Sequence, residues 1–190
     1  MTLRYLFPTT IGIYQDDAIA ETIIPYAKRY LADDSELTNT WGYKNTYKPV
    51  NGLETKEELQ FLCDYIKGIG NLYLQENGFK SQKLIPHMFF SGMVGGDVHS
   101  KHTHPNSVLS GVLYLDVPEG SGKIRFHEPN PLKKINKFDI ENDSEPNWEW
   151  FELPPEKGMI LVFPSWLEHE VLENKSQQDR MTLVFNLAYF

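Results

Sequence analysis

The spacing of apolar residues along the chain changes near residue 80. Before that point they recur every three or four residues, as on one face of an α-helix. After it they alternate with polar residues or form short runs, which indicates β-strands. Gly, Pro and Asn separate these runs, as is typical of antiparallel sheets. The pattern therefore predicts helices first and then a sheet.

Two helices are expected in the first half of the chain. Asp16 and Asp17 can cap the first one, and Pro25 should kink it or leave it short. Its apolar face is formed by Ile19, Ile23, Ala27 and Tyr30. We therefore expect an amphipathic helix that packs on the sheet.

The second helix has a clear start and stop in the sequence. Thr55 and Glu58 have the spacing of a capping box, and Asn77-Gly78 is a typical helix end. Cys63 lies beside the apolar stripe and is expected to be a small buried side chain. The stripe consists of Leu59, Leu62, Ile66, Ile69 and Tyr73.

Eight strands are expected after Leu84, near 84–94, 98–104, 108–117, 123–127, 148–153, 158–163, 168–173 and 180–189. They predict a mainly β fold with flanking α-helices, a double-stranded β-helix or jelly roll. Residues 1–190 are expected to form one domain, with 1–80 as a helical flank and 81–190 as the jelly-roll core. The stretch 128–147 has no periodicity, and loops of that length often cover a binding site.

The composition excludes several classes of protein. The 190 residues are 41% hydrophobic and 23% charged, which is typical of a globular domain. A net charge of -8 argues against nucleic acid and anionic membranes as partners. The chain has one cysteine, no apolar run of about 20 residues and no signal-peptide pattern. These features together predict a cytoplasmic protein.

Three of the six histidines, at positions 99, 102 and 104, lie within six residues. Because side chains alternate along a strand, His102 and His104 should project from the same face. His169 follows the strand predicted at 158–163 and can lie beside them in a closed double sheet. Three imidazoles from two strands are typical of a non-haem iron or related metal site with open positions. Imidazole suits Fe, Zn, Cu and Ni, so the ligands alone do not choose the metal.

Arg180 begins the last predicted strand, eleven residues after His169. A hairpin return from His169 would place this arginine at the depth of the metal site. A guanidinium buried there requires an anion, and its fork geometry matches a carboxylate. Tyr114 is either a core aromatic residue or a second donor to the same anion.

Five segments of the chain resemble the 2-oxoglutarate/Fe(II)-dependent oxygenases of the prolyl-hydroxylase-like branch: LFPTTIGIY, HTHPNSVLSGVLYL, GKIRF, GMILVFPSWLEHEV and RMTLVFN. The resemblance implies a double-stranded β-helix that uses Fe(II), 2-oxoglutarate and O2. It implies hydroxylation of a substrate, coupled to decarboxylation of 2-oxoglutarate to succinate. It also implies that His102 and His169 bind iron. Arg180, Tyr114 and Thr182 would hold the far carboxylate of the co-substrate.

One position departs from the usual pattern of such oxygenases. A carboxylate is usual two residues after the first histidine, whereas this chain has His104 followed by Pro105. His104 could complete a three-histidine face, or it could stand aside, as in aspartyl-hydroxylase-like enzymes that use two histidines and water. A third arrangement takes an oxygen ligand from Asp97 or Glu168. We favour the three-histidine face, because the alternation along a strand points His102 and His104 to one side.

Two other functions are open at this stage. The residues around Gly96 and around Gly158 also resemble the two cupin motifs, which would make the chain a three-histidine metal dioxygenase or isomerase. A non-catalytic jelly roll that binds sugar or protein is the third reading of the sequence. Arg180 and Tyr114 discriminate between them, because a cupin does not need these residues at its metal.

Several further side chains could contribute to the site. His127 and Glu128 could line its mouth, and Trp41, Trp148 and Trp150 could shape a substrate surface, although packing or surface roles are favoured for all five. Three histidines are left without a firm assignment, His87, His99 and His127. The residues fit a small-molecule or a peptidyl substrate and do not choose between them, and they do not predict an oligomeric state.

Overall fold

The computed structural model describes residues 2, 4, 6–134, 139–142 and 144–189. This part of the chain contains two α-helices, Asp17–Ala32 (α1) and Gln60–Glu76 (α2). Its strands are β1 Gly12–Gln15, β2 Lys44–Asn45, β3 Leu84–Met93, β4 His99–His102, β5 Leu109–Asp116, β6 Ile124–His127, β7 Trp150–Leu153, β8 Met159–Pro164, β9 His169–Val171 and β10 Arg180–Tyr189. Four short 3-10 turns are present at Leu53–Thr55, Glu57–Leu59, Pro131–Lys134 and Glu145–Asn147.

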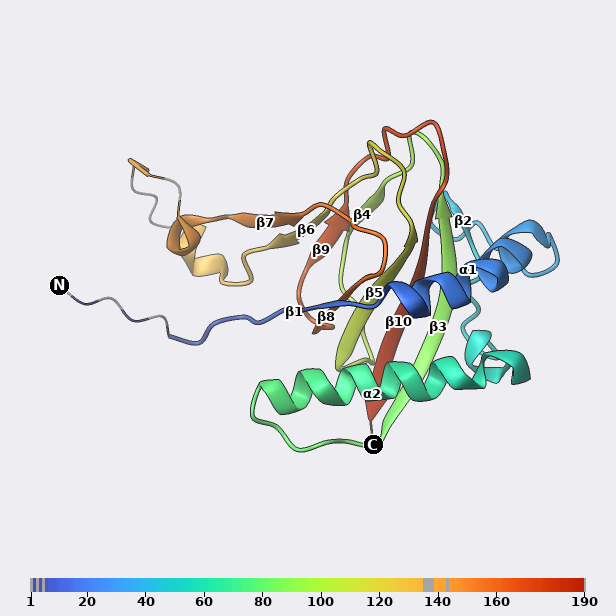
Figure 1. Cartoon of the computed structure of the whole chain (residues 1–190). Helices are drawn as coiled ribbons and strands as arrows, with labels where there is room; N and C mark the ends of the chain where they lie inside the picture. The colour runs from blue at the N-terminus through green and yellow to red at the C-terminus, as the bar shows by residue number, and fades with distance from the viewer. Residues whose placement is uncertain (1, 3, 5, 135–138, 143, 190) are drawn as a thin grey trace.

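The strands form two antiparallel sheets. A six-stranded sheet has the order β1-β8-β5-β10-β3-β2, and a four-stranded sheet has the order β4-β9-β6-β7 (Figure 1). From β3 onward the chain passes from one sheet to the other at every step except between β6 and β7. The predicted mainly β, double-stranded β-helix fold is confirmed.

All eight predicted strands are present, and the structure contains two further strands, β1 and β2, that the sequence did not predict. β1 pairs with β8 from Gly12 opposite Val162 to Gln15 opposite Met159, and β2 pairs with β3. Both lie at edges of the six-stranded sheet. Residues 1–80 are therefore not a purely helical flank. Within the described ranges, no helix has the length and hydrophobicity that a lipid bilayer would require.

Helix α1 begins as predicted but is longer than Pro25 suggested. The Asp16 carboxylate accepts a hydrogen bond from the Ile19 amide at 2.9 Å, so Asp16 is the N-cap. The helix continues through Pro25 to Ala32. Pro25 lies on the exposed side of α1, where the carbonyl group that loses its helical partner can face water.

The predicted capping box of α2 is wrong. Two 3-10 turns precede the helix, and the Glu58 carboxylate accepts hydrogen bonds from the side chains of Tyr30 and Arg29 instead. The predicted helix end is confirmed, since Asn77 is the C-cap and Gly78 has a φ of 78°. Cys63 is buried as expected.

Two hydrophobic layers support the six-stranded sheet. The larger layer lies under α1 and α2, which cover the same face of this sheet (Figure 1). It includes Ile23, Ala27, Leu62, Ile66, Leu183 and Phe185. The smaller layer fills the space between the sheets at β5, β6 and β8, with Ile124, Phe126, Leu161 and Phe163 among its members. The part of the interior that β3 and β10 share with β4 and β9 is not filled in this way.

The long loop after β6 does not cover this open part. β7 is the edge strand of the four-stranded sheet, and the segment that joins β6 to β7 projects away from both sheets (Figure 1). None of its described residues lines the cavity between the sheets. The expectation that loop 128–147 covers a site is therefore wrong for its described part; residues 135–138 and 143 lie outside the described residues.

A glycine in β5 gives a test of the packing under the helices. Gly111 lies between β8 and β10, and a Cβ atom added there would overlap the Phe185 ring and the Leu161 carbonyl oxygen. Gly111→Ala should therefore lower the free energy of unfolding by about 1–3 kcal/mol in denaturant titrations. Gly68→Ala is the control, because its Cβ would lie in open space on α2 and should raise stability by up to about 1 kcal/mol. If both substitutions changed the free energy of unfolding in the same direction, the assigned packing at Gly111 would be wrong.

Candidate metal centre

A cavity of about 790 Å³ opens between the two sheets. Its floor is the inner face of β3 and β10, and β4 and β9 form the opposite wall. The lining includes His102, His104, His169 and Arg180. The cavity therefore holds both parts of the site that the sequence predicts.

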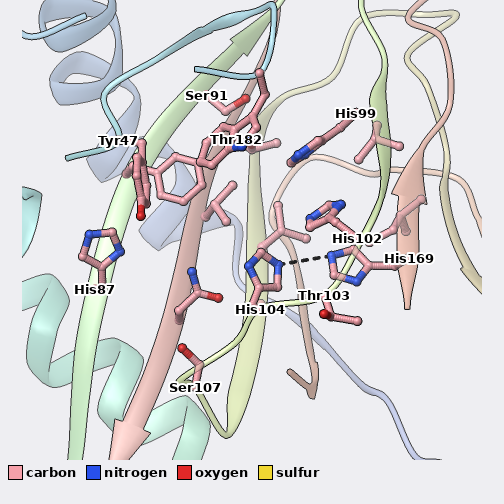
Figure 2. Close-up of a pocket in the computed structure, with 18 of the residues that line it drawn as sticks. Tyr47, His87, Ser91, His99, His102, Thr103, His104, Ser107, His169 and Thr182 are labelled. Atoms are coloured by element: carbon pink, nitrogen blue, oxygen red, sulfur yellow. Dashed lines mark hydrogen bonds between the residues drawn. The ribbon is translucent and has the colours of Figure 1, made fainter. Parts of the chain in front are cut away.

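Three histidine rings meet in this cavity (Figure 2). His102 on β4 lies directly opposite His169 on β9. His104 lies two residues beyond the end of β4, where its amide donates a hydrogen bond to the Ser165 carbonyl at 2.9 Å. One nitrogen from each ring lies within 4.8 Å of the others, and Nε2 of His104 is 3.3 Å from Nε2 of His169. The predicted strand 98–104 is thus shorter, but its two histidines reach the same point.

Backbone carbonyls orient two of the three rings. Nδ1–H of His102 donates to the Ser100 carbonyl at 2.7 Å, and Nδ1–H of His169 donates to the Leu167 carbonyl at 2.8 Å. Because a carbonyl group only accepts hydrogen bonds, Nε2 of each ring carries the lone pair that a metal needs. In the described part of the chain no such partner holds Nδ1 of His104. Its ring is the least fixed of the three.

Burial keeps these rings neutral. Desolvation, together with the neighbouring histidines, lowers the pKa of His104 and of His169 to about 3. Burial also lowers the pKa of His102. Neutral imidazole is the form that binds a metal ion, so the cluster is ready for one at physiological pH.

Neither of the two acidic residues considered as oxygen ligands joins the cluster. The Glu168 carboxylate forms an ion pair with Lys101 at 2.8 Å, and both side chains are nearly half exposed. Asp97 accepts a hydrogen bond from the Val94 amide in the turn before β4. Among the described residues, the three histidines form the one group with metal-binding spacing. The structure does not support the arrangement with an acidic ligand.

Arg180 lines the same cavity and is 3% exposed. Its Nη1 donates to the Gly122 carbonyl at 3.0 Å and its Nη2 contacts Met93 Sδ at 2.8 Å, whereas Nε is buried without a partner. No ion pair to Arg180 is present in the described chain. Burial lowers its pKa, although a guanidinium stays charged in proteins. The site therefore has a buried positive charge that lacks an anion.

The predicted hairpin between His169 and Arg180 is wrong. β9 belongs to the four-stranded sheet and β10 to the six-stranded sheet, so the chain crosses from one sheet to the other. A buried strand can be followed by such a crossing as easily as by a hairpin, and strand spacing alone does not distinguish them. The crossing still places Arg180 and His169 on walls of one cavity.

Tyr114 and Thr182 lie beside Arg180. They are directly opposite each other on β5 and β10, both are buried, and both line the cavity. The Arg180 guanidinium lies 5.8 Å from the centre of the Tyr114 ring. Burial raises the pKa of Tyr114 to about 12, so its hydroxyl keeps its proton and can donate a hydrogen bond. The structure thus brings together all six predicted site residues.

The other predicted contributors are mostly elsewhere. Trp41 lines the cavity, but four residues do not: His127, Glu128, Trp148 and Trp150. His127 contacts Glu170 at 3.2 Å, and Trp150 packs against Arg125. The packing and surface roles favoured for these four are what the structure shows.

Aromatic rings form a further wall of the cavity. It consists of Trp41, Tyr43, Tyr47, His87 and Phe89, and of these sequence reasoning had named only Trp41 for a substrate surface. Alternation along β3 could have placed His87 and Phe89 on the inner face. The segment before β3 has no periodicity, so nothing in the sequence placed Tyr43 and Tyr47 at the cavity.

The metal-free protein should lose stability as the pH falls from about 6.5 to 3. Unfolded histidines titrate near pH 6.5, whereas the pKa of His99, His104 and His169 is about 3 in the folded state. Between these values the unfolded state binds protons that the folded state does not, so the free energy of unfolding decreases with decreasing pH. Each histidine contributes at most about 1.4 kcal/mol per pH unit. Urea titrations of chelator-treated protein measure this slope.

The double variant His104→Asn/His169→Asn is the control for this prediction. It should show a shallower slope between pH 6.5 and 5, above the range in which most carboxylates titrate. Equal slopes in the two proteins would contradict the assigned pKa shifts.

Several solved structures have a similar fold. A prolyl-4-hydroxylase from Pseudomonas putida is 16% identical, with a TM-score of 0.60 over 96% of this chain and 94% of that one. The non-heme alpha ketoglutarate dependent epimerase SnoN from nogalamycin biosynthesis is 13% identical, with a TM-score of 0.69 over 95% and 77%. EvdO2 from Micromonospora carbonacea var. aurantiaca, complexed with 2-oxoglutarate, is 12% identical, with a TM-score of 0.57 over 96% and 87%. At these identities the likeness shows the fold alone.

Sequence comparison identifies the family. A search of curated proteins gave no match. The sequence model of a family described as "Putative 2OG-Fe(II) oxygenase" matches residues 88–186, just over half of the chain, including the three histidines and Arg180. This family uses Fe(II), 2-oxoglutarate and O2. The neutral histidine cluster and the buried guanidinium without an anion fit an iron ion and a dicarboxylate. The chain belongs to the 2-oxoglutarate/Fe(II)-dependent oxygenases.

Proposed function

We propose that this enzyme is a dioxygenase that hydroxylates a small-molecule or peptidyl substrate and converts 2-oxoglutarate to succinate and CO2. One observation carries the proposal. Arg180, buried without an acidic partner, lines the same cavity as three neutral histidines. A dicarboxylate can satisfy both features, with one carboxylate at Arg180 and its other end toward the histidines.

The three histidines supply the metal-binding face. Nε2 of His102 and of His169 is held toward the centre of the cluster by the hydrogen bonds at Nδ1. His104 adds a third neutral ligand in place of the usual carboxylate. Bound iron would activate O2 and serve as the template on which co-substrate and substrate meet. The cavity side of the cluster stays open for them.

Arg180 orients the co-substrate and neutralises its charge. Two of its five N–H groups are used by Gly122 and Met93, and the unpaired Nε–H is among those that remain. Tyr114 and Thr182 line the same cavity, and their hydroxyl groups would add uncharged donors. Arg180 does not transfer protons, because a guanidinium stays protonated. Its contribution is positioning.

The lining of the cavity limits the substrate. In the described chain it includes no Asp or Glu, and its charged residues are Lys101 and Arg180. The wall that leads outward consists of aromatic rings, with Trp41 4.8 Å from Tyr47 and 5.5 Å from Phe89 between ring centres. We therefore favour an uncharged or anionic substrate with an apolar or planar part.

A cupin-type metal enzyme is the second candidate, because it shares the three-histidine cluster. A cupin-type function does not explain why an arginine and a tyrosine are buried in the metal-binding cavity. Arg180 and Tyr114 occupy this position, and their burial favours the oxygenase. A non-catalytic jelly roll gives no reason for either feature.

Anaerobic reconstitution tests the proposal. Protein loaded with Fe(II) should develop a weak visible charge-transfer band when 2-oxoglutarate is added, and it should form succinate when air is admitted. Protein without iron should do neither. If iron binds but neither band nor succinate appears, the proposal is wrong and the cupin reading takes its place.

Replacing the arginine should separate co-substrate binding from metal binding. Arg180→Met removes the charge-assisted hydrogen bonds to the carboxylate, so the Kd for 2-oxoglutarate should rise by about 100-fold or more, while iron affinity is unchanged. Anaerobic titration of the charge-transfer band measures both. Arg29→Ala, which removes an exposed arginine on α1, is the control and should bind 2-oxoglutarate normally. An unchanged Kd in Arg180→Met would refute the assignment.

Replacing His104 tests the three-histidine face. His104→Ala should weaken Fe(II) binding by more than about 10-fold, because it removes one of three ligands. His87→Ala is the control, since His87 lines the cavity but lies outside the cluster. Metal titration under anaerobic conditions compares the two variants. If His104→Ala binds iron as tightly as the unmodified protein, the arrangement with two histidines and water is correct instead.

A further inference from the structure

A β-bulge turns a fourth histidine toward the metal cluster. His99 and His102 are three residues apart on β4, and in a regular strand such residues face opposite sides. The pairing with β9 shifts between them, because His99 lies opposite Val171 and His102 opposite His169. One extra residue on β4 therefore re-aims a side chain, as bulges near active sites often do. Both rings line the cavity as a result.

Three contacts hold the His99 ring in place. It stacks on the His102 ring, with 3.9 Å between ring centres and an interplanar angle of 22°. The Trp41 ring lies 5.4 Å away. Nδ1 of His99 is hydrogen-bonded to the hydroxyl group of Tyr43, a residue 4% exposed, at 3.0 Å. Among the described residues, the one hydrogen bond of the His99 ring is this contact at Nδ1, and Nε2 has no partner. Figure 2 shows the His99 ring beside that of His102.

His99 lines the cavity but is not part of the metal-binding group, which consists of His102, His104 and His169. Its ring stacks on the ring of His102, and Arg180 lines the same cavity. A co-substrate that joins the cluster to Arg180 therefore shares the cavity with the His99 ring.

The contact with Tyr43 decides which ring nitrogen of His99 can donate a hydrogen bond. Burial raises the pKa of Tyr43, so the phenol keeps its own proton. When the Tyr43 hydroxyl donates to Nδ1, the ring proton is on Nε2.

We propose that His99 binds the co-substrate, with Nε2–H donating a hydrogen bond to an oxygen at the metal-facing end of 2-oxoglutarate and with Tyr43 fixing the tautomer. This inference rests on the proposed function, which supplies the dicarboxylate. The co-substrate is then held at both ends, by Arg180 at one carboxylate and by His99 at the other. A hydrogen bond from Nε2–H would orient that oxygen beside the histidine cluster.

Three variants test the role of His99. His99→Phe keeps a ring between His102 and Trp41 but removes the donor. Its Kd for 2-oxoglutarate should rise by about 10-fold or more in the Fe(II)-loaded protein, with the affinity for Fe(II) alone unchanged within about twofold. Tyr43→Phe should show a smaller increase in this Kd, since the tautomer is no longer fixed. His99→Gln, which keeps an N–H donor, should recover part of the affinity.

The measurements are anaerobic titrations of metal and of 2-oxoglutarate, with His87→Phe as the matched control in the same cavity. If Arg180→Met loses 2-oxoglutarate binding but His99→Phe does not, this inference is overturned and the proposed function stands. If metal and 2-oxoglutarate affinities fall together in His99→Phe, the ring only supports His102, and the inference is again overturned. If the unmodified protein does not bind 2-oxoglutarate, both proposals fail.

Discussion

A guanidinium buried between two sheets without a carboxylate beside it costs free energy until an anion joins it. Arg180 is in this state, with Nε unpaired at the first residue of β10. The Tyr114 ring lies 5.8 Å from this guanidinium, and three neutral histidines share its cavity. Under the proposed function, the stability given up at Arg180 is recovered when the co-substrate binds there.

Much of the fold can be predicted from the spacing of apolar residues. Alternation located all eight strands from Leu84 onward, and helical spacing located α1 and α2. One of the two strands it missed, β2, has two residues, which are too few for a periodic pattern. The other, β1, has four residues, as many as β4, β6 and β7, so its length does not explain why it was missed. Predictions from local sequence rules failed where the tertiary structure offered a residue another contact or environment. Glu58 bonds to α1 residues instead of capping α2, and Pro25 is accommodated because it faces solvent.

The site was predictable where it depends on strand geometry and residue type. His102, His169 and Arg180 follow from alternation, from imidazole chemistry and from the need of a buried cation for an anion. The sheet crossing between His169 and Arg180 did not follow, because a sequence does not show which sheet a strand joins. His99 was left without an assignment, and the bulge that turns it into the cavity appears only in the pairing with β9.

The most direct test of this account is an anaerobic crystal structure with Fe(II) and 2-oxoglutarate. The account predicts iron about 2.1 Å from a nitrogen of His102, His104 and His169, and a carboxylate of the co-substrate in two-point contact with Arg180. Iron bound with His104 more than about 3 Å away would contradict the three-histidine face. A dicarboxylate bound away from Arg180 would contradict the central claim.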